Sequence, residues 1–136
     1  MKKSSRNPEF KDANLELLIR RAINKTAGKI TDGDMMNIEE LYIQKSDITD
    51  ISGIERCVNL KILDLSFNDI SDISMISGLI NLENLEMSSN KISDITALHE
   101  LVNLKRVIIN ATQVKDISAL SKLKTSGKAV CGKYPD

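Results

Sequence analysis

A 22-residue repeat is the feature that most restricts the fold of this 136-residue chain. The segment LKILDLSFNDISDISMISGLIN, which begins at Leu60, is followed at once by the similar segment LENLEMSSNKISDITALHELVN. Counting in steps of 22 aligns four units without a gap, beginning at Ile38, Leu60, Leu82 and Leu104, and we number positions within each unit from these residues. Such a period is typical of a solenoid, whose units bury their apolar side chains against neighbouring units.

Each unit carries two apolar patterns in succession. Positions 4, 6, 11, 14, 17 and 20 are apolar in all four units, for example Leu41, Leu63, Leu85 and Val107 at position 4. The alternation in LKILDLS predicts a short strand, and the spacing of three in SDISMISGL predicts a 3₁₀ or other short helical turn. Stacked units would therefore form a parallel sheet on one side and short turns on the other.

The pattern L-x-x-L-x-L-x-x-N-x-I-x-D-I resembles the leucine-rich repeat family, directly from Ile38 to about Lys124. The 22-residue spacing and the D-I-S segment resemble the bacterial internalin-like class. This resemblance implies an α/β solenoid: a right-handed superhelix with a parallel concave sheet, a convex side of 3₁₀ or short turns, and a helical N-terminal cap.

The domain plan follows from this frame. We expect a flexible segment at 1–9, a helical cap at 10–37, four repeats at 38–125, and a degenerate terminal strand and tail at 126–136. In the tail, the 22-residue frame places Ala129 at position 4 and Cys131 at position 6. Cys57 and Cys131 would then lie at opposite ends of the stack, too far apart for an intramolecular disulfide.

The cap itself shows helix signals. Asp12 is a candidate N-cap, Gly28 follows the expected helix end, and Thr31 and Asp34 have the spacing of a capping box for a second short helix. One face of the first helix would be apolar, with Leu15, Leu18, Ile19, Ala22 and Ile23.

Composition and charge exclude several classes of function. Lys and Arg together equal Asp and Glu in number, so no net positive charge attracts nucleic acid. No apolar run is long enough for membrane insertion, and no signal peptide is seen at the basic start of the chain. There is no C-x-x-C pair or glycine-rich phosphate loop, so we expect no metal and no cofactor.

Recurring polar residues have a structural and a chemical interpretation. Asp50, Asp72, Asp94 and Asp116 share one position, where they would either form a cation ladder or cap the turns, and we favour capping. We expect a second set of polar side chains to form hydrogen bonds with the backbone of the loops. This set comprises Asn68 and Asn90 at position 9, Ser46 and Thr112 at the same position in the outer units, and Asn59, Asn81 and Asn103 before the strands. The single histidine, His99, is expected to be solvated, and we predict no enzyme activity.

The outward positions of the concave strands are the candidate binding surface. Positions 3, 5 and 7 should point out of the sheet, including Ser66 and Ser88, with Lys45 and Phe67 at the margin. Asp64 and Glu86 should be neighbours, either solvated or binding a cation or a partner's Lys or Arg. The predicted partner-binding residues are Glu40, Tyr42, Gln44, Ile62, Asp64, Phe67, Asn84, Glu86, Arg106 and Ile108.

We therefore predict a non-enzymatic protein–protein interaction module that binds a protein ligand through the concave face. The resemblance implies surface or exported recognition; the alternatives are an intracellular regulatory scaffold that docks on an enzyme, and a structural repeat segment of a longer surface protein. A signal peptide in the full gene would favour surface or exported recognition. If the chain is complete as given and has no signal peptide, a cytoplasmic regulatory scaffold would be favoured. We expect a monomer, with an end-to-end dimer as the alternative.

Overall fold

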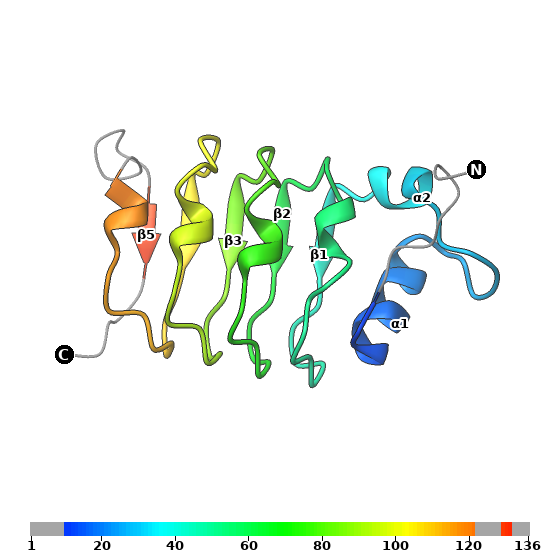
Figure 1. The fold of residues 1–136 in the computed structure, drawn as a ribbon, viewed down its shortest axis with the longest axis horizontal. Helices are drawn as coiled ribbons and strands as arrows, with labels where there is room; N and C mark the ends of the chain where they lie inside the picture. Colours follow the sequence, from blue (N-terminus) through cyan, green and yellow to red (C-terminus); the bar gives the residue numbers. More distant parts are fainter. Residues whose placement is uncertain (1–9, 122–128, 132–136) are drawn as a thin grey trace.

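The computed structural model describes residues 10–121 and 129–131, and its repeats stack side by side into a solenoid (Figure 1). Its five parallel strands form one sheet in chain order: β1 Glu40–Tyr42, β2 Ile62–Asp64, β3 Asn84–Glu86, β4 Arg106–Ile108 and β5 Ala129–Cys131. A 3₁₀ helix follows each of the first four strands: η1 Ile54–Arg56, η2 Ser74–Ile76, η3 Thr96–Leu98 and η4 Ser118–Leu120. The predicted solenoid with strands on one side and 3₁₀ turns on the other is confirmed. The predicted flexible segment 1–9 and most of the predicted tail lie outside the described residues.

The repeated apolar positions form one continuous core. All members of positions 1, 4, 6, 11 and 17 are buried, and at position 14 only Ile117 is partly exposed. Cys57 stands among the leucines of position 20 with no exposed surface, and burial raises the pKa of its thiol to about 12. Burial of apolar area is the main driving force here, because each repeat supplies too few residues to fold alone.

The register of the sheet is regular until its last strand. Leu41 pairs with Leu63, Leu63 with Leu85, and Leu85 with Val107, each pair 22 residues apart. Val107 then pairs with Val130. The prediction of Ala129 at position 4 and Cys131 at position 6 was therefore wrong by one residue, because the fourth unit contains one residue more than the others.

The helical elements differ in two respects from the sequence prediction. Helices α1 Ala13–Ala22 and α2 Asp32–Met36 form the N-terminal cap, with Asp12 as the N-cap of α1. Helix α1 buries Leu15 and Ile19, but Ala22 is exposed. Its end is marked by Asn24, not by Gly28. Asn24 has φ 55°, its N–H donates to Arg21 O, and the N–H of Lys25 donates to Arg20 O, which together make a Schellman motif.

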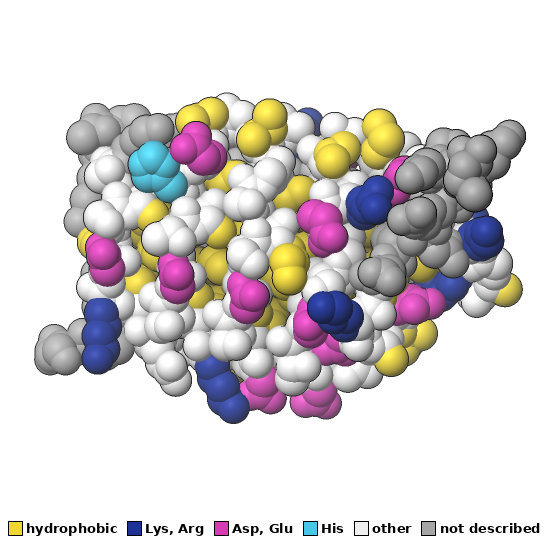
Figure 2. Space-filling model, viewed as in Figure 1, with side chains coloured by type: hydrophobic (Ala, Val, Ile, Leu, Met, Phe, Trp, Pro, Cys, Tyr) yellow, Lys and Arg dark blue, Asp and Glu magenta, His cyan; other side chains and the backbone are white. Residues whose placement is uncertain are grey.

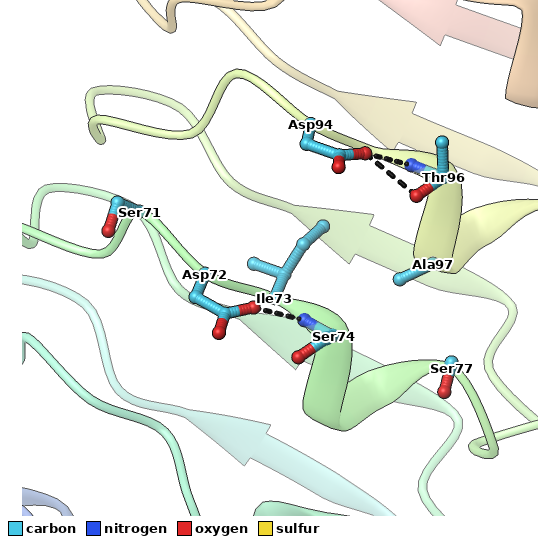
Figure 3. Close-up of a pocket in the computed structure, with 8 residues that line it drawn as sticks. All are labelled: Ser71, Asp72, Ile73, Ser74, Ser77, Asp94, Thr96 and Ala97. Carbon is cyan, nitrogen blue, oxygen red and sulfur yellow. Dashed lines mark hydrogen bonds between the residues drawn. The ribbon is translucent and has the colours of Figure 1, made fainter.

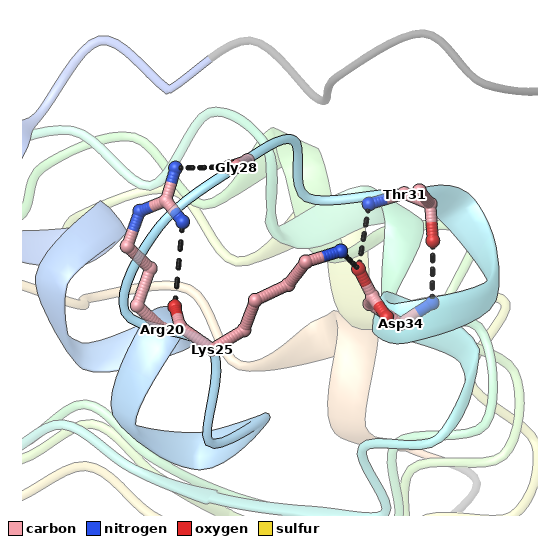
Figure 4. Close-up of polar contacts among 5 residues, drawn as sticks. All are labelled: Arg20, Lys25, Gly28, Thr31 and Asp34. Atoms are coloured by element: carbon pink, nitrogen blue, oxygen red, sulfur yellow. Dashed lines mark hydrogen bonds and ion pairs between the residues drawn. The ribbon is translucent and has the colours of Figure 1, made fainter.

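A polar network joins the two helices of the cap (Figure 4). Lys25 Nζ lies 2.9 Å from Asp34 Oδ2, and the same carboxylate oxygen accepts the N–H of Thr31. Thr31 Oγ1 in turn accepts the N–H of Asp34, which completes the predicted capping box. Arg20 donates to the carbonyls of Lys25 and Gly28 and so holds the loop between the helices.

Every described repeat passes through a left-handed residue at position 8, which the sequence did not reveal. These residues are Lys45, Phe67, Ser89 and Ala111, with φ values of 53°, 58°, 56° and 53°. None is a glycine, although an L-residue pays roughly 1–2 kcal/mol in this conformation. The conformation is imposed by the sheet, since the position-8 N–H of Lys45, Phe67 and Ser89 still donates to the next repeat while the chain turns away.

This strain gives a first testable prediction at Ser89. Ser89→Gly should change the free energy of unfolding by less than about 0.5 kcal/mol, because relief of strain offsets the greater freedom of the unfolded glycine. Ser89→Val should cost about 1–2 kcal/mol, since a β-branched residue is poorly tolerated at positive φ. Urea unfolding of both variants checks the order; a valine variant as stable as the natural protein would contradict it.

Candidate functional site

The outward side of β1–β4, which we call the sheet face, contains a hollow of about 250 Å³. Seven of the ten predicted partner-binding residues line it: Tyr42, Ile62, Asp64, Asn84, Glu86, Arg106 and Ile108. Glu40, Gln44 and Phe67 are exposed but lie outside the lining. None of the ten is buried, so all remain accessible to a partner.

Strand register arranges these side chains in two rows. Tyr42, Asp64, Glu86 and Ile108 are successive register partners at position 5, and Glu40, Ile62, Asn84 and Arg106 are successive partners at position 3. Neighbouring strands lie about 4.8 Å apart, so each row presents its chemistry at closely spaced steps. The hollow thus has a carboxylate pair at its centre, a tyrosine towards β1, and an arginine and an isoleucine on β4.

The carboxylate pair is held in place from one side. Asp64 Oδ1 accepts the N–H of Ser66 at 2.9 Å and its hydroxyl at 2.6 Å. Ser66 and Ser88 are only 3% and 6% exposed, so the prediction that both point outward was wrong. Within residues 10–121 neither Asp64 nor Glu86 forms an ion pair with a basic side chain. Two adjacent like charges on a sheet are unfavourable, and a cationic group from a partner would relieve them.

Aromatic side chains stand beside this centre. Tyr42 is 53% exposed, and its hydroxyl donates to Glu40 Oε1 at 3.0 Å. That hydrogen bond is the main reason that the pKa of Tyr42 is raised above its ordinary value. Phe67 is equally exposed, with Lys45 Nζ 5.3 Å from its ring centre. Exposed rings held by neighbouring polar groups lose little side-chain entropy on binding, which suits them as interface anchors.

The recurring aspartates on the opposite side cap turns, as predicted. Asp72 and Asp94 each accept the N–H of the residue two positions on, at 2.8 and 2.9 Å, beside a shallow hollow of about 430 Å³ (Figure 3). Asp50 and Asp116 make the same bond in their repeats. These backbone N–H groups are the main reason that the pKa values of Asp72, Asp94 and Asp116 are lowered.

The recurring asparagines also serve the backbone. Asn68 accepts the N–H of Ser46 and Ile48, and donates to three carbonyls. One unit later, Asn90 accepts the N–H of Ile70 and donates to three carbonyls. Thr112 bonds within its own turn: it donates to Ile109 O and accepts the N–H of Val114.

Within the described part of the chain, no three His, Cys, Asp or Glu side chains gather as a metal site would require. His99 is exposed, and its ring Nδ1 lies 3.1 Å from Glu100 Oε1. No described helix has the length and apolarity of a membrane span.

One further surface was missed in the sequence. Position 21 carries exposed apolar side chains, preceded by one from α2: Met36, Val58, Ile80 and Val102, which are 41–56% exposed. The same 22-residue stepping that revealed the core would have revealed this row, but the exposure of its members depends on the fold.

Comparison with known proteins places this architecture. The family model for leucine-rich repeats, two copies to a match, fits residues 37–80 and again 80–122. This chain belongs to the leucine-rich repeat family. No curated protein sequence matches it.

Solved structures agree with the internalin-like prediction, which is confirmed. An internalin (inlF) from Listeria monocytogenes matches 93% of this leucine-rich repeat chain with a TM-score of 0.79 and 28% identity. The match covers 45% of that internalin, so this chain spans less than half of its length. The CBM51-2 and INT domains of Clostridium perfringens ZmpB match 68% of this chain and 20% of their own, with a TM-score of 0.60 and 27% identity. Internalin C2 from Listeria monocytogenes, at 23% identity and a TM-score of 0.53, shows the same fold over 99% of this chain and 83% of its own.

Proposed function

We propose that this protein is a non-enzymatic module that binds a protein ligand through its sheet face. The leucine-rich repeat fold and the internalin-like structures support an interaction module in general. The observation that carries the finer proposal is the hollow of about 250 Å³, whose lining combines Tyr42, a carboxylate pair and Arg106. Aromatic residues and arginine are enriched at protein interfaces, and all these side chains remain accessible.

The chemistry of the hollow suggests how a ligand would bind. A lysine or arginine side chain of the ligand would lie against Asp64 and Glu86, where its charge offsets their repulsion. An acidic ligand residue would pair with Arg106, and apolar ligand groups would contact Tyr42 and Ile108. Because the carboxylates and the arginine stand on different strands, the ligand must present its charges in a fixed order.

Partner capture from extracts of source cells and of a host tests this proposal. The variant carries Tyr42→Ala, Glu86→Ala and Arg106→Ala and spares Asp64, which holds the backbone of Ser66. We expect the natural protein to capture a ligand that this variant loses, with the melting temperature unchanged within a few degrees, since all three side chains are at least partly exposed.

A matched control removes an apolar, an acidic and a basic side chain elsewhere, through Leu17→Ala, Glu100→Ala and Lys115→Ala, all exposed. The control should capture the same ligand as the natural protein. Equal capture by the natural protein and the sheet-face variant would contradict the proposal and favour a structural role for the repeats.

A further inference from the structure

A second surface lies along the edge of the solenoid at which the strands begin, the upper edge in Figure 1. In the same orientation, the space-filling view shows hydrophobic side chains along this edge (Figure 2). The apolar row Met36, Val58, Ile80 and Val102 comes four residues before strands β1–β4, and its members have exposed fractions of 48%, 41%, 54% and 56%. A repeated row of apolar side chains at the surface is unusual unless another surface covers it.

The backbone beneath this row is fixed. An asparagine comes directly after Val58, Ile80 and Val102, and its side chain donates to the backbone carbonyl of the row member one repeat earlier. Asn59 donates to Met36 O at 2.9 Å, Asn81 to Val58 O at 3.1 Å, and Asn103 to Ile80 O at 2.7 Å. The apolar side chains therefore stand at a constant spacing, about 5 Å from one repeat to the next. A row held in this way is already arranged for binding and loses little entropy when it is covered.

Beside the apolar row, position 2 carries charges of alternating sign: Glu39, Lys61, Glu83 and Lys105. Backbone hydrogen bonds tie this row together as well, since the N–H groups of Lys61, Glu83 and Lys105 each donate to the carbonyl of the row member before them, at 2.7–2.8 Å. Within the molecule, Lys61 Nζ lies 3.5 Å from Glu39 Oε1, and Lys105 Nζ lies 3.1 Å from Glu83 Oε1. These four residues keep much of their side chains exposed, so their charges are available to a partner.

The order of these charges identifies the partner. If two copies meet edge to edge with their stacks antiparallel about an axis between Lys61 and Glu83, Glu39 faces Lys105 and Lys61 faces Glu83, so each contact in this register joins opposite charges. If the stacks run parallel with the same repeats facing each other, every contact joins like charges, which is unfavourable. A two-fold axis that runs from the sheet face to the 3₁₀ side produces the antiparallel arrangement and also brings the two apolar rows together. An isologous interface of this kind must be self-complementary, and this edge is.

We propose that a second copy of this chain docks on this edge, to form a two-fold homodimer through the apolar row and the alternating charges. The interface is small, so we expect a weak dimer with a dissociation constant on the order of 100 μM. The same axis leaves both sheet faces open and turned to the same side. A dimer would therefore offer two ligand-binding faces at once, which strengthens binding to a repeated ligand.

Sedimentation equilibrium over roughly 10 μM to 1 mM protein tests the dimer. The natural protein should change from monomer to dimer across this range, and Ile80→Asp should remain monomeric throughout. Leu17→Asp is the matched control, because Leu17 is exposed to a similar extent, at 50%, but lies on α1; this variant should dimerise like the natural protein. Absence of dimer at the highest concentration, or a dimer that survives Ile80→Asp, would overturn the proposal.

A charge-exchange cycle then tests the antiparallel arrangement. Lys61→Glu and Glu83→Lys should each weaken the dimer about fivefold or more, because each places like charges across the axis. The double variant restores opposite charges between the copies and should recover dimerisation to within about threefold. The intramolecular ion pairs lost in the single variants are exposed and contribute little to stability. If the double variant loses as much free energy of dimerisation as the two single variants together, the antiparallel arrangement is rejected.

Discussion

Replacement of Asn68 by alanine should lower the free energy of unfolding by about 3–4 kcal/mol, the largest effect that we predict. The amide oxygen of Asn68 accepts the N–H groups of Ser46 and Ile48, each at 3.0 Å. Its amide nitrogen donates to Ile43 O and Leu65 O, each at 2.9 Å, and to a third carbonyl at 3.3 Å. Because Asn68 is only 8% exposed, water cannot replace all of these bonds in the variant.

The comparison with Asn59 shows whether burial causes this effect. Asn59→Ala removes one hydrogen bond, to Met36 O, at an exposed position, and should cost no more than about 1 kcal/mol. Urea unfolding of both variants at neutral pH measures the difference. A cost below about 1 kcal/mol for Asn68→Ala would show that the loops between the repeats satisfy their backbone in another way.

The 22-residue repeat determines how much of the fold could be predicted from the sequence. The 22-residue columns identified the core, because a stacked repeat must keep apolar residues at constant positions. The same columns identified Asn68 and Asn90 as side chains that hydrogen-bond the loop backbone, and the recurring aspartates as caps of the turns. The register of β5 could not be predicted, because the extra residue of the fourth unit leaves no mark in the apolar pattern.

The side of the sheet on which a candidate site residue lies could be predicted only within the strands, where side chains alternate between the two faces. Alternation holds through Ile62–Asp64 and correctly places the residues that line the hollow. Beyond position 6 the chain turns away through a left-handed residue, and alternation no longer tells which side a residue takes. Ser66 was assigned to the surface for that reason, although its hydroxyl is buried against Asp64.

The second large effect is expected at Asp12, which joins the N-terminal cap to the first repeat. Its Oδ1 accepts the N–H of Asn14 within the cap, and its Oδ2 accepts the N–H of Thr49 at 2.8 Å and of Asp50 at 3.3 Å. Asp12→Ala should cost about 2–3 kcal/mol at pH 7, because it removes a helix N-cap and leaves the N–H groups of Thr49 and Asp50 without their charged acceptor. Asp94→Asn is the matched control for Asp12→Asn, the variant used in the pH series below: an asparagine can still accept the N–H of Thr96, so the cost of Asp94→Asn should stay below about 0.5 kcal/mol.

The dependence of this effect on pH separates the charge of Asp12 from its shape. Burial acts to raise the pKa of Asp12, but the N–H groups of Thr49, Asp50 and Asn14 together hold it below its ordinary value. A carboxyl with a lowered pKa in the folded state stabilises the fold fully above its unfolded pKa of about 3.9, and this contribution is lost as the pH falls through the folded pKa. Asp12→Asn should therefore be less stable than the natural protein at pH 7, and the difference should shrink below about pH 4. Urea unfolding from pH 7 to pH 3 measures it; a difference that stays constant over this range would show that the charge of Asp12 does not hold the cap on the repeats.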